Sequence, residues 1–76
     1  HSPCAMLPSD SVIQALAAAV LAQPEDVDLR LHLSALLLQA GRAGDALEHV
    51  GSVLAKDPAH LEALRLGAQA AAAVGD

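Results

Sequence analysis

The fold is decided between two prolines, Pro24 and Pro58, where the chain reads PEDVDLRLHLSALLLQAGRAGDALEHVGSVLAKDP. These prolines are 34 residues apart, and Gly41 and Gly75 are also 34 residues apart. Proline stops a helix because it lacks an N–H group, and glycine closes one because it tolerates the left-handed conformation. Two helix-ending residue types that recur with one period predict a stacked array of helix–turn–helix units.

Outward from this stretch, turn residues divide the chain into four expected helices, at residues 9–23, 25–40, 43–56 and 59–74. Ser9 is the expected cap of the first helix. Gly51 lies inside the third helix, where glycine is less favourable than alanine. We therefore expect another backbone to approach closely there. Apolar residues at three- and four-residue spacing give three expected inner stripes: Val12, Ile13, Leu16, Val20 and Leu21; Ala46, Leu47, Val50, Val53 and Leu54; and Leu61, Leu64, Ala68 and Ala71.

The second segment also carries a pattern that is typical of a strand. Apolar and polar residues alternate from Val27 to Ser34, which is the period of a half-buried strand. Three observations favour a helix. The alternating apolar residues are mostly leucine, the run continues without a break through residues 36–38, and no other segment could pair with a lone strand.

The composition agrees with an all-α fold. The chain has 18 Ala and 14 Leu, no aromatic residue, and seven β-branched residues. Its formal charge of −5, with four Lys or Arg, argues against a nucleic-acid surface. The apolar stretch at residues 12–22 is too short to span a membrane. A signal peptide needs basic residues ahead of its apolar core, and the first Lys or Arg in this chain is Arg30, so we expect no signal peptide and a cytoplasmic location.

The N-terminal residues 1–5 carry no fold signal. They include the single cysteine, Cys4, which permits no intramolecular disulfide, and they directly precede the single methionine, Met6. We interpret residues 1–5 as a remnant of an affinity tag and cloning site and residues 6–76 as one domain. A reactive thiol or an intermolecular disulfide is the alternative for Cys4.

The chain resembles the tetratricopeptide repeat. One full unit fits residues 27–60. Seven positions in it carry the kind of apolar, small or turn residue that the repeat keeps there: Leu33, Leu37, Gly41, Ala46, Val50, Val53 and Pro58. The flanking helices resemble a preceding second helix and a following first helix. The turn sequences are similar to those of bacterial members. The resemblance implies four antiparallel helices stacked as hairpins.

Several positions depart from the family pattern. Arg30 stands where the family usually has a large apolar residue, Ser34 replaces a Gly or Ala, and Gly67 stands where a leucine is expected. The alternative interpretation is an Ala/Leu-rich four-helix bundle in which the 34-residue spacing arises by chance.

In stacked repeats the first helix of each unit lines a concave surface. By resemblance, the exposed first-helix positions form a groove for a protein or peptide partner: Asp28, Leu31, His32, Ala35, Leu38, Gln39, Glu62, Arg65 and Gln69. Leu31 and Leu38 either line an apolar groove or pack on a neighbouring helix. The carboxylate clamp of some family members needs Lys and Asn where this chain has Leu31 and Ala35, so the resemblance disfavours that ligand.

No pattern in the sequence indicates catalysis, a cofactor or a metal site. The chain has no glycine-rich phosphate loop, and His32, His49 and His60 lack zinc-ligand spacing. We therefore expect surface or helix-capping histidines. Asp28 with His32, Asp45 with His49, and Glu62 with Arg65 have the spacing of solvated surface pairs.

The function expected from the sequence is a non-catalytic protein–protein interaction module. By resemblance, it would be a terminal domain of a larger bacterial protein, with an AAA-type ATPase as the neighbouring part. The alternative is self-association, as a homodimer or by helix exchange, because a short array leaves apolar faces such as Val12, Leu16 and Val20, or the Ala-rich last helix, uncovered.

Overall fold

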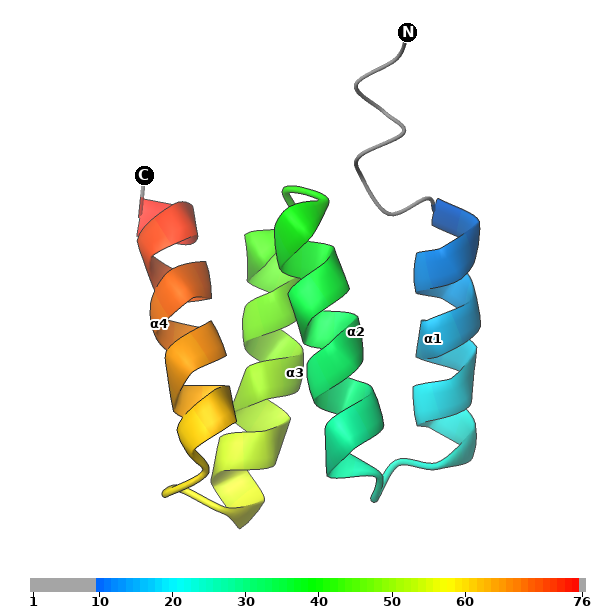
Figure 1. Cartoon of the computed structure of the whole chain (residues 1–76), viewed down its shortest axis with the longest axis horizontal. Coiled ribbons are helices and arrows are strands. Elements are labelled where there is room, and N and C mark those ends of the chain that lie inside the picture. The colour runs from blue at the N-terminus through cyan, green and yellow to red at the C-terminus, as the bar shows by residue number, and fades with distance from the viewer. Residues whose placement is uncertain (1–9, 76) are drawn as a thin grey trace, which may run out of the picture.

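A computed structural model of the chain describes residues 10–75. It contains four helices: α1 (Asp10–Ala22), α2 (Val27–Gln39), α3 (Ala43–Lys56) and α4 (Leu61–Gly75). Residues 10–75 contain no strand, so the all-α fold class is confirmed and the alternating segment forms α2. Successive helices run antiparallel, with α1 and α4 at opposite sides of α2 and α3 (Figure 1). The expected tag remnant at residues 1–5 and the expected cap Ser9 lie outside the described residues.

Side chains before α2 and α4 set the first residues of these helices. Asp26 accepts a hydrogen bond from the backbone N–H of Leu29 at 3.0 Å, and His60 accepts one from Ala63 at 3.2 Å. Each helix therefore begins two residues later than expected, at Val27 and Leu61. The residues that follow Pro24 and Pro58 belong to turns.

Gly41 closes α2 in the way that the sequence predicts. Its φ of 82° lies in the left-handed region. The N–H of Gly41 donates to the carbonyl of Leu38 at 3.1 Å, and the N–H of Arg42 donates to Leu37 at 2.8 Å. This pair of bonds satisfies two carbonyl groups at the helix end and turns the chain directly into α3.

The core consists of two clusters on either side of α2. In the first, Leu33 and Leu37 pack with Ile13 and Val20 of α1 and with Ala46 of α3. In the second, Leu31 packs with residues of α3 and α4: Val50, Val53, Ala63 and Leu66. The half-buried Leu38 packs against both clusters. Residues of α2 pack into both clusters, so the helix has two apolar faces. The apolar and polar residues of its sequence therefore alternate although the segment is a helix.

The expected inner stripe of the first helix is wrong in part, and that of the fourth helix is wrong throughout. In α1, Ile13 and Val20 are buried, but Val12 and Leu21 are 47% and 82% exposed. In α4 the buried residues are Ala63, Leu66 and Ala70, and the expected stripe faces outward, with Leu61 82% and Leu64 44% exposed. The apolar residues of α1 and α4 are therefore divided between the core and two uncovered faces.

The close approach expected at Gly51 is wrong, and a close contact lies at Gly67 instead. A Cβ added at Gly51 would meet nothing within 4 Å, so no backbone approaches there. A Cβ at Gly67 would lie 3.2 Å from Cγ1 of the buried Val50. Val50 therefore occupies the space that a leucine at position 67 would need, which accounts for this departure from the family pattern.

Candidate functional site

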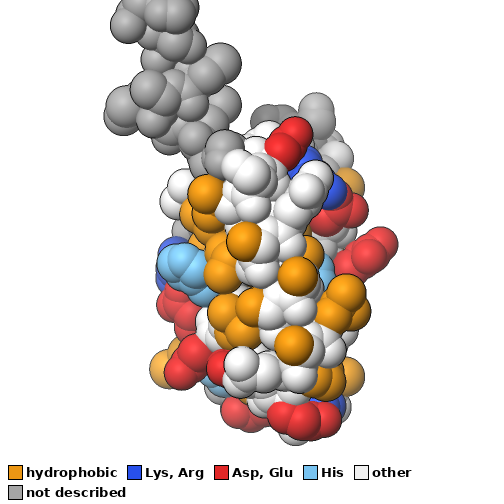
Figure 2. Space-filling model, turned by 90° about the vertical axis from the view of Figure 1, so that its right-hand side faces the viewer, with side chains coloured by type: hydrophobic (Ala, Val, Ile, Leu, Met, Phe, Trp, Pro, Cys, Tyr) orange, Lys and Arg blue, Asp and Glu red, His pale blue; other side chains and the backbone are white. Residues whose placement is uncertain are grey.

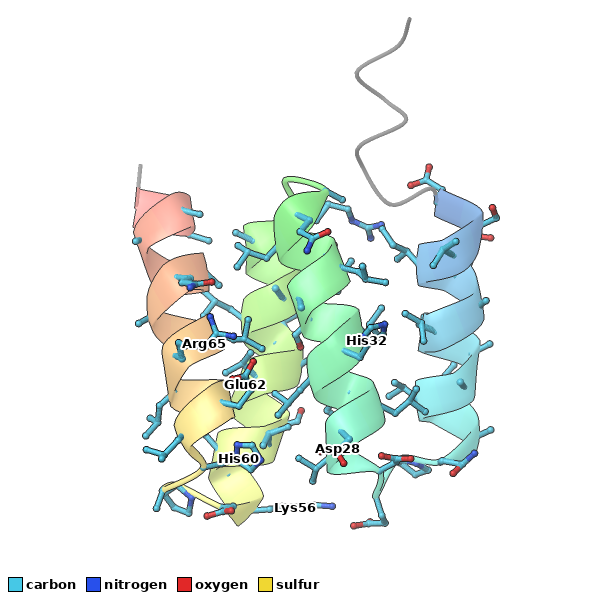
Figure 3. All side chains as sticks on the ribbon, viewed as in Figure 1. Asp28, His32, Lys56, His60, Glu62 and Arg65 are labelled. Atoms are coloured by element: carbon cyan, nitrogen blue, oxygen red, sulfur yellow. The ribbon has the colours of Figure 1, made fainter. Side chains whose placement is uncertain are left out.

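A cleft of about 250 Å³ lies between α2 and α4. A single water needs about 10–15 Å³ of such space, so the cleft can hold a side chain or a peptide segment. Its lining combines apolar and ionisable side chains: Asp28, Leu31, His32, Ala35, His60 and Glu62. Figure 3 shows Glu62 extending from α4 in the direction of α2, with Asp28 and His60 at one end of the two helices.

Five of these six residues belong to the groove expected from the sequence, and His60 is the addition. The expectation of exposure is wrong for Leu31, which is 4% exposed and belongs to the second core cluster. Leu31 and the half-buried Ala35 therefore form an apolar floor rather than projecting side chains. The other expected groove residues, Leu38, Gln39, Arg65 and Gln69, are not in contact with the cleft.

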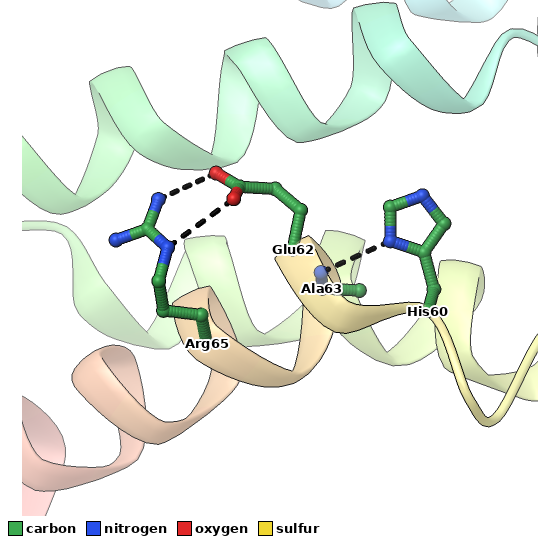
Figure 4. Close-up of polar contacts among 4 residues, drawn as sticks. All are labelled: His60, Glu62, Ala63 and Arg65. Atoms are coloured by element: carbon green, nitrogen blue, oxygen red, sulfur yellow. Dashed lines mark hydrogen bonds and ion pairs between the residues drawn. The ribbon is translucent and has the colours of Figure 1, made fainter.

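Glu62 is held in place by Arg65, one turn further along α4. The guanidinium donates two hydrogen bonds to the carboxylate, Nε to Oε1 at 3.2 Å and Nη2 to Oε2 at 2.5 Å (Figure 4). These hydrogen bonds lower the pKa of Glu62 from its usual 4.5, and Glu62 in turn raises the pKa of Arg65. A carboxylate has about four acceptor sites, so Glu62 keeps acceptor capacity for a ligand.

His60 borders the cleft because it caps α4. Its Nδ1 accepts the hydrogen bond from the N–H of Ala63, so the hydrogen of the neutral ring is on Nε2, which points away from Ala63 (Figure 4). This nitrogen is a donor for a partner's carbonyl oxygen. The signal in the sequence is the position of His60 three residues before Ala63, after the helix-breaking Pro58.

Every described cation already has a polar partner. Lys56 contacts Glu25 at 2.7 Å, Arg42 contacts Asp45 at 2.9 Å, and Arg65 contacts Glu62. The fourth, Arg30, lies 3.3 Å from Nδ1 of His49 and donates to the carbonyl of Pro24. By contrast, Asp28 has no hydrogen bond or ion pair through its side chain within the described region. The cleft therefore offers uncompensated negative charge.

A smaller hollow, of about 70 Å³, lies between α2 and α3 and is bordered by Arg30 and Lys56. Here the Arg30 side chain spans from α2 to His49 on α3, in the place where the family usually has a large apolar residue. Ser34, the other departure, is buried and donates its hydroxyl to the carbonyl of Arg30 at 3.0 Å. The polar side chains of both residues that depart from the family pattern therefore form hydrogen bonds.

The described residues offer no site for a metal ion made from three or more His, Cys, Asp or Glu side chains. Asp28 and His32 form no hydrogen bond with each other, and Asp45 pairs with Arg42 rather than with His49. None of the helices in residues 10–75 is both long and apolar enough to cross a membrane.

A family model described as tetratricopeptide repeat matches residues 8–75. No curated protein and no solved structure matches the chain. Tetratricopeptide repeats generally mediate protein–protein interactions and are generally not enzymes, and the match covers nearly the whole chain. The chain therefore belongs to the tetratricopeptide repeat family.

Proposed function

We propose that this chain is a non-catalytic module that binds a segment of a protein partner in the cleft between α2 and α4. The observation that carries the proposal is the make-up of the cleft, an apolar floor of Leu31 and Ala35 beneath a rim of hydrogen-bonding side chains. Such a site buries the apolar part of a ligand and orients it through a few polar contacts.

The charge of the rim identifies the kind of side chain that fits. Asp28 is unpaired, Glu62 is fixed by Arg65 with acceptor capacity to spare, and the lining contains no Lys or Arg. A lysine or arginine side chain would lay its apolar stem on the floor and its charged head against the carboxylates. The partner segment is therefore basic at the position that enters the cleft.

Peptides that are selected against the whole chain from a random display library test the docking site. Selected peptides should shift the amide NMR signals of Asp28, His32 and Glu62. Ala35→Gln fills the cleft and should weaken binding about tenfold or more. Ala55→Gln makes the same change on the exposed face of α3 and should leave binding unaltered. Peptides that bind A35Q as tightly as the original chain would exclude this site.

Small probes test the charge preference without a peptide. n-Butylammonium copies the lysine side chain, 1-butanol keeps its stem, and butyrate reverses its charge. We expect n-butylammonium to bind the cleft best, and Asp28→Asn to weaken it about two- to fivefold. Glu48→Gln removes one negative charge from the exposed face of α3 and is the matched control. Equal binding of butyrate would contradict a basic partner.

The setting of the module is a further part of the proposal. A cytoplasmic location stays a prediction from the sequence. The neighbouring AAA-type ATPase stays a prediction from the family resemblance. Tracing the coding region on both sides of residues 1–76 would identify any neighbouring domain and decide this point.

A second candidate function is self-association, by dimerisation or by helix exchange. It is favoured by the two uncovered faces, which expose Val12 on α1 and Leu61 and Leu64 on α4. Figure 2 shows the α1 side, with hydrophobic side chains spread along the helix and charged side chains around its edge. Light scattering over a concentration series tests this function, and a strict monomer would exclude it.

A further inference from the structure

The 34-residue period makes α1 the counterpart of α3, and α2 the counterpart of α4. Adding 34 to the bounds of α1, 10–22, gives 44–56, and α3 covers 43–56. Adding 34 to the bounds of α2, 27–39, gives 61–73, and α4 covers 61–75. Only α2 and α3 thus form a complete unit within the described residues, while α4 and α1 each lack the other half.

In the complete unit, α2 and α3 meet through polar and apolar contacts. Arg30 lies 3.3 Å from Nδ1 of His49, and the Nζ of Lys56 lies 2.7 Å from Glu25. Leu37 and Ala46 lie in the same core cluster, a large side chain on α2 and a small one on α3. These contacts define the face that each helix turns toward its partner in the unit.

The same face is uncovered on α4 and on α1. Leu64 takes the place of Arg30 and is 44% exposed. Val12 takes the place of Ala46 and is 47% exposed. The remaining counterparts on these two faces are all alanines with exposed side chains: Ala15 for His49, Ala22 for Lys56, Ala59 for Glu25 and Ala71 for Leu37.

The two uncovered faces are uncharged at these positions and complement each other in size. Each ionisable residue that joins α2, or the turn before it, to α3 is replaced by Leu or Ala at the corresponding position of α1, of α4 or of the turn before α4. Contact between α4 and α1 would therefore bury no charge at these positions, which removes the main cost of burying them. The Leu37 and Ala46 pair becomes Ala71 and Val12, so a large residue again faces a small one.

We infer that a second copy of this chain docks its α1 against α4 of the first and completes a repeat unit. The inference rests on the self-association candidate and continues the stack in the order already present within the chain. Because α1 and α4 lie at opposite sides of the molecule (Figure 1), each copy keeps one free face after docking. The contact is head-to-tail, so the assembly grows as an open chain rather than closing as a dimer.

Sedimentation velocity tests this geometry, with interference optics because the chain has no Tyr or Trp. The original chain should form species larger than a dimer as its concentration rises. Ala15→Glu damages the α1 face and Leu64→Glu the α4 face, so each variant alone should be a monomer. Leu21→Glu is the control, because its counterpart Ala55 is exposed in α3 and lies outside the contact. Circular dichroism checks that each variant is helical.

Mixing the two damaged variants provides the decisive result. A15E keeps an intact α4 face and L64E keeps an intact α1 face, so an equimolar mixture should form a complex of two chains and no larger species. A mixture that stays monomeric would overturn the inference. So would an original chain that is monomeric throughout. If only one of the two variants prevents assembly, self-association stands, but through a face that pairs with its own copy, and the head-to-tail contact is wrong.

Discussion

Val50 of α3 fills the space beside Gly67 of α4, where an added Cβ would lie 3.2 Å from Cγ1 of the valine. Val50 is 1% exposed, so the packed core resists its displacement. A leucine at Gly67 would have to move it, and we expect Gly67→Leu to destabilise the chain by about 1–3 kcal/mol.

The alanine substitutions at the two mid-helix glycines measure this contact directly. Gly51→Ala meets nothing within 4 Å and should stabilise the chain by about 0.4–1 kcal/mol. Gly67→Ala has the same helix-propensity gain, but the contact with Val50 should cancel it. Urea unfolding of both variants tests the difference. Equal gains would show that Val50 moves aside without cost.

His49 makes stability depend on pH. Burial lowers its pKa from 6.5, and the nearby Arg30 lowers the pKa further. Below about pH 6.5 the unfolded chain binds a proton that the folded chain resists, so the free energy of unfolding should fall as the pH falls through this window. Thermal melts from neutrality to about pH 5 measure the loss, and His49→Gln should remove it.

A charge variant separates the two causes of this shift. Arg30→Gln removes the Coulomb repulsion but not the burial, so the pKa of His49 should rise toward 6.5 without reaching it. NMR titration of the His49 ring measures the pKa. The pKa values of Glu25 and Glu62 are lowered from 4.5, so these two groups change the free energy of unfolding at lower pH than His49 does. An unchanged His49 titration in R30Q would contradict the contact seen at 3.3 Å.

The cap of α2 should make a measurable contribution to stability. Asp26→Ala removes the acceptor for the N–H of Leu29 and should cost about 1 kcal/mol. Asp26→Asn keeps an acceptor and should retain most of the stability. Asp57→Ala is the matched control, because Asp57 contributes backbone bonds at the end of α3. A similar loss in D57A would mean that the effect of D26A is not the cap.

Leu31 should behave as a core residue in a stability measurement. It is 4% exposed and packs with Val50 and Leu66, so Leu31→Ala should cost about 2–5 kcal/mol and Leu31→Glu should prevent folding. Circular dichroism melts decide the question. A folded L31E variant that merely loses partner binding would instead support the groove position, one of the two alternatives that the sequence leaves open for Leu31.

The helices and the turn at Gly41 could be predicted because local chemistry determines them. Pro24, Pro58 and Gly41 end helices whatever surrounds them, and their spacing indicates the family. The first residues of α2 and α4 were harder to predict from the sequence. Asp26 and His60 compete with earlier residues for the cap, and the turn bonds that select them appear only in the folded chain.

The buried faces of α1, α2 and α4 could not be read from periodicity. Each of these helices has more apolar residues than one stripe can hold, so the neighbouring helices determine which of them are covered. Leu31 is buried because α3 and α4 cover the second face of α2. Leu61 is exposed because no described helix covers that side of α4. Five residues of the cleft were still predicted, since α2 and α4 were recognised as equivalent helices.

The position of α2 between the two core clusters has a consequence for how the molecule opens. Among the described helices α1 lies beside α2 alone, whereas α2 borders α1, α3 and α4. Detaching α1 would expose Ile13 and Val20 but leave the packing around Val53 and Ala63 intact. In deuterated solvent the amides of α1 should therefore exchange first, through a partial opening, and those of α2 last, when the whole domain comes apart.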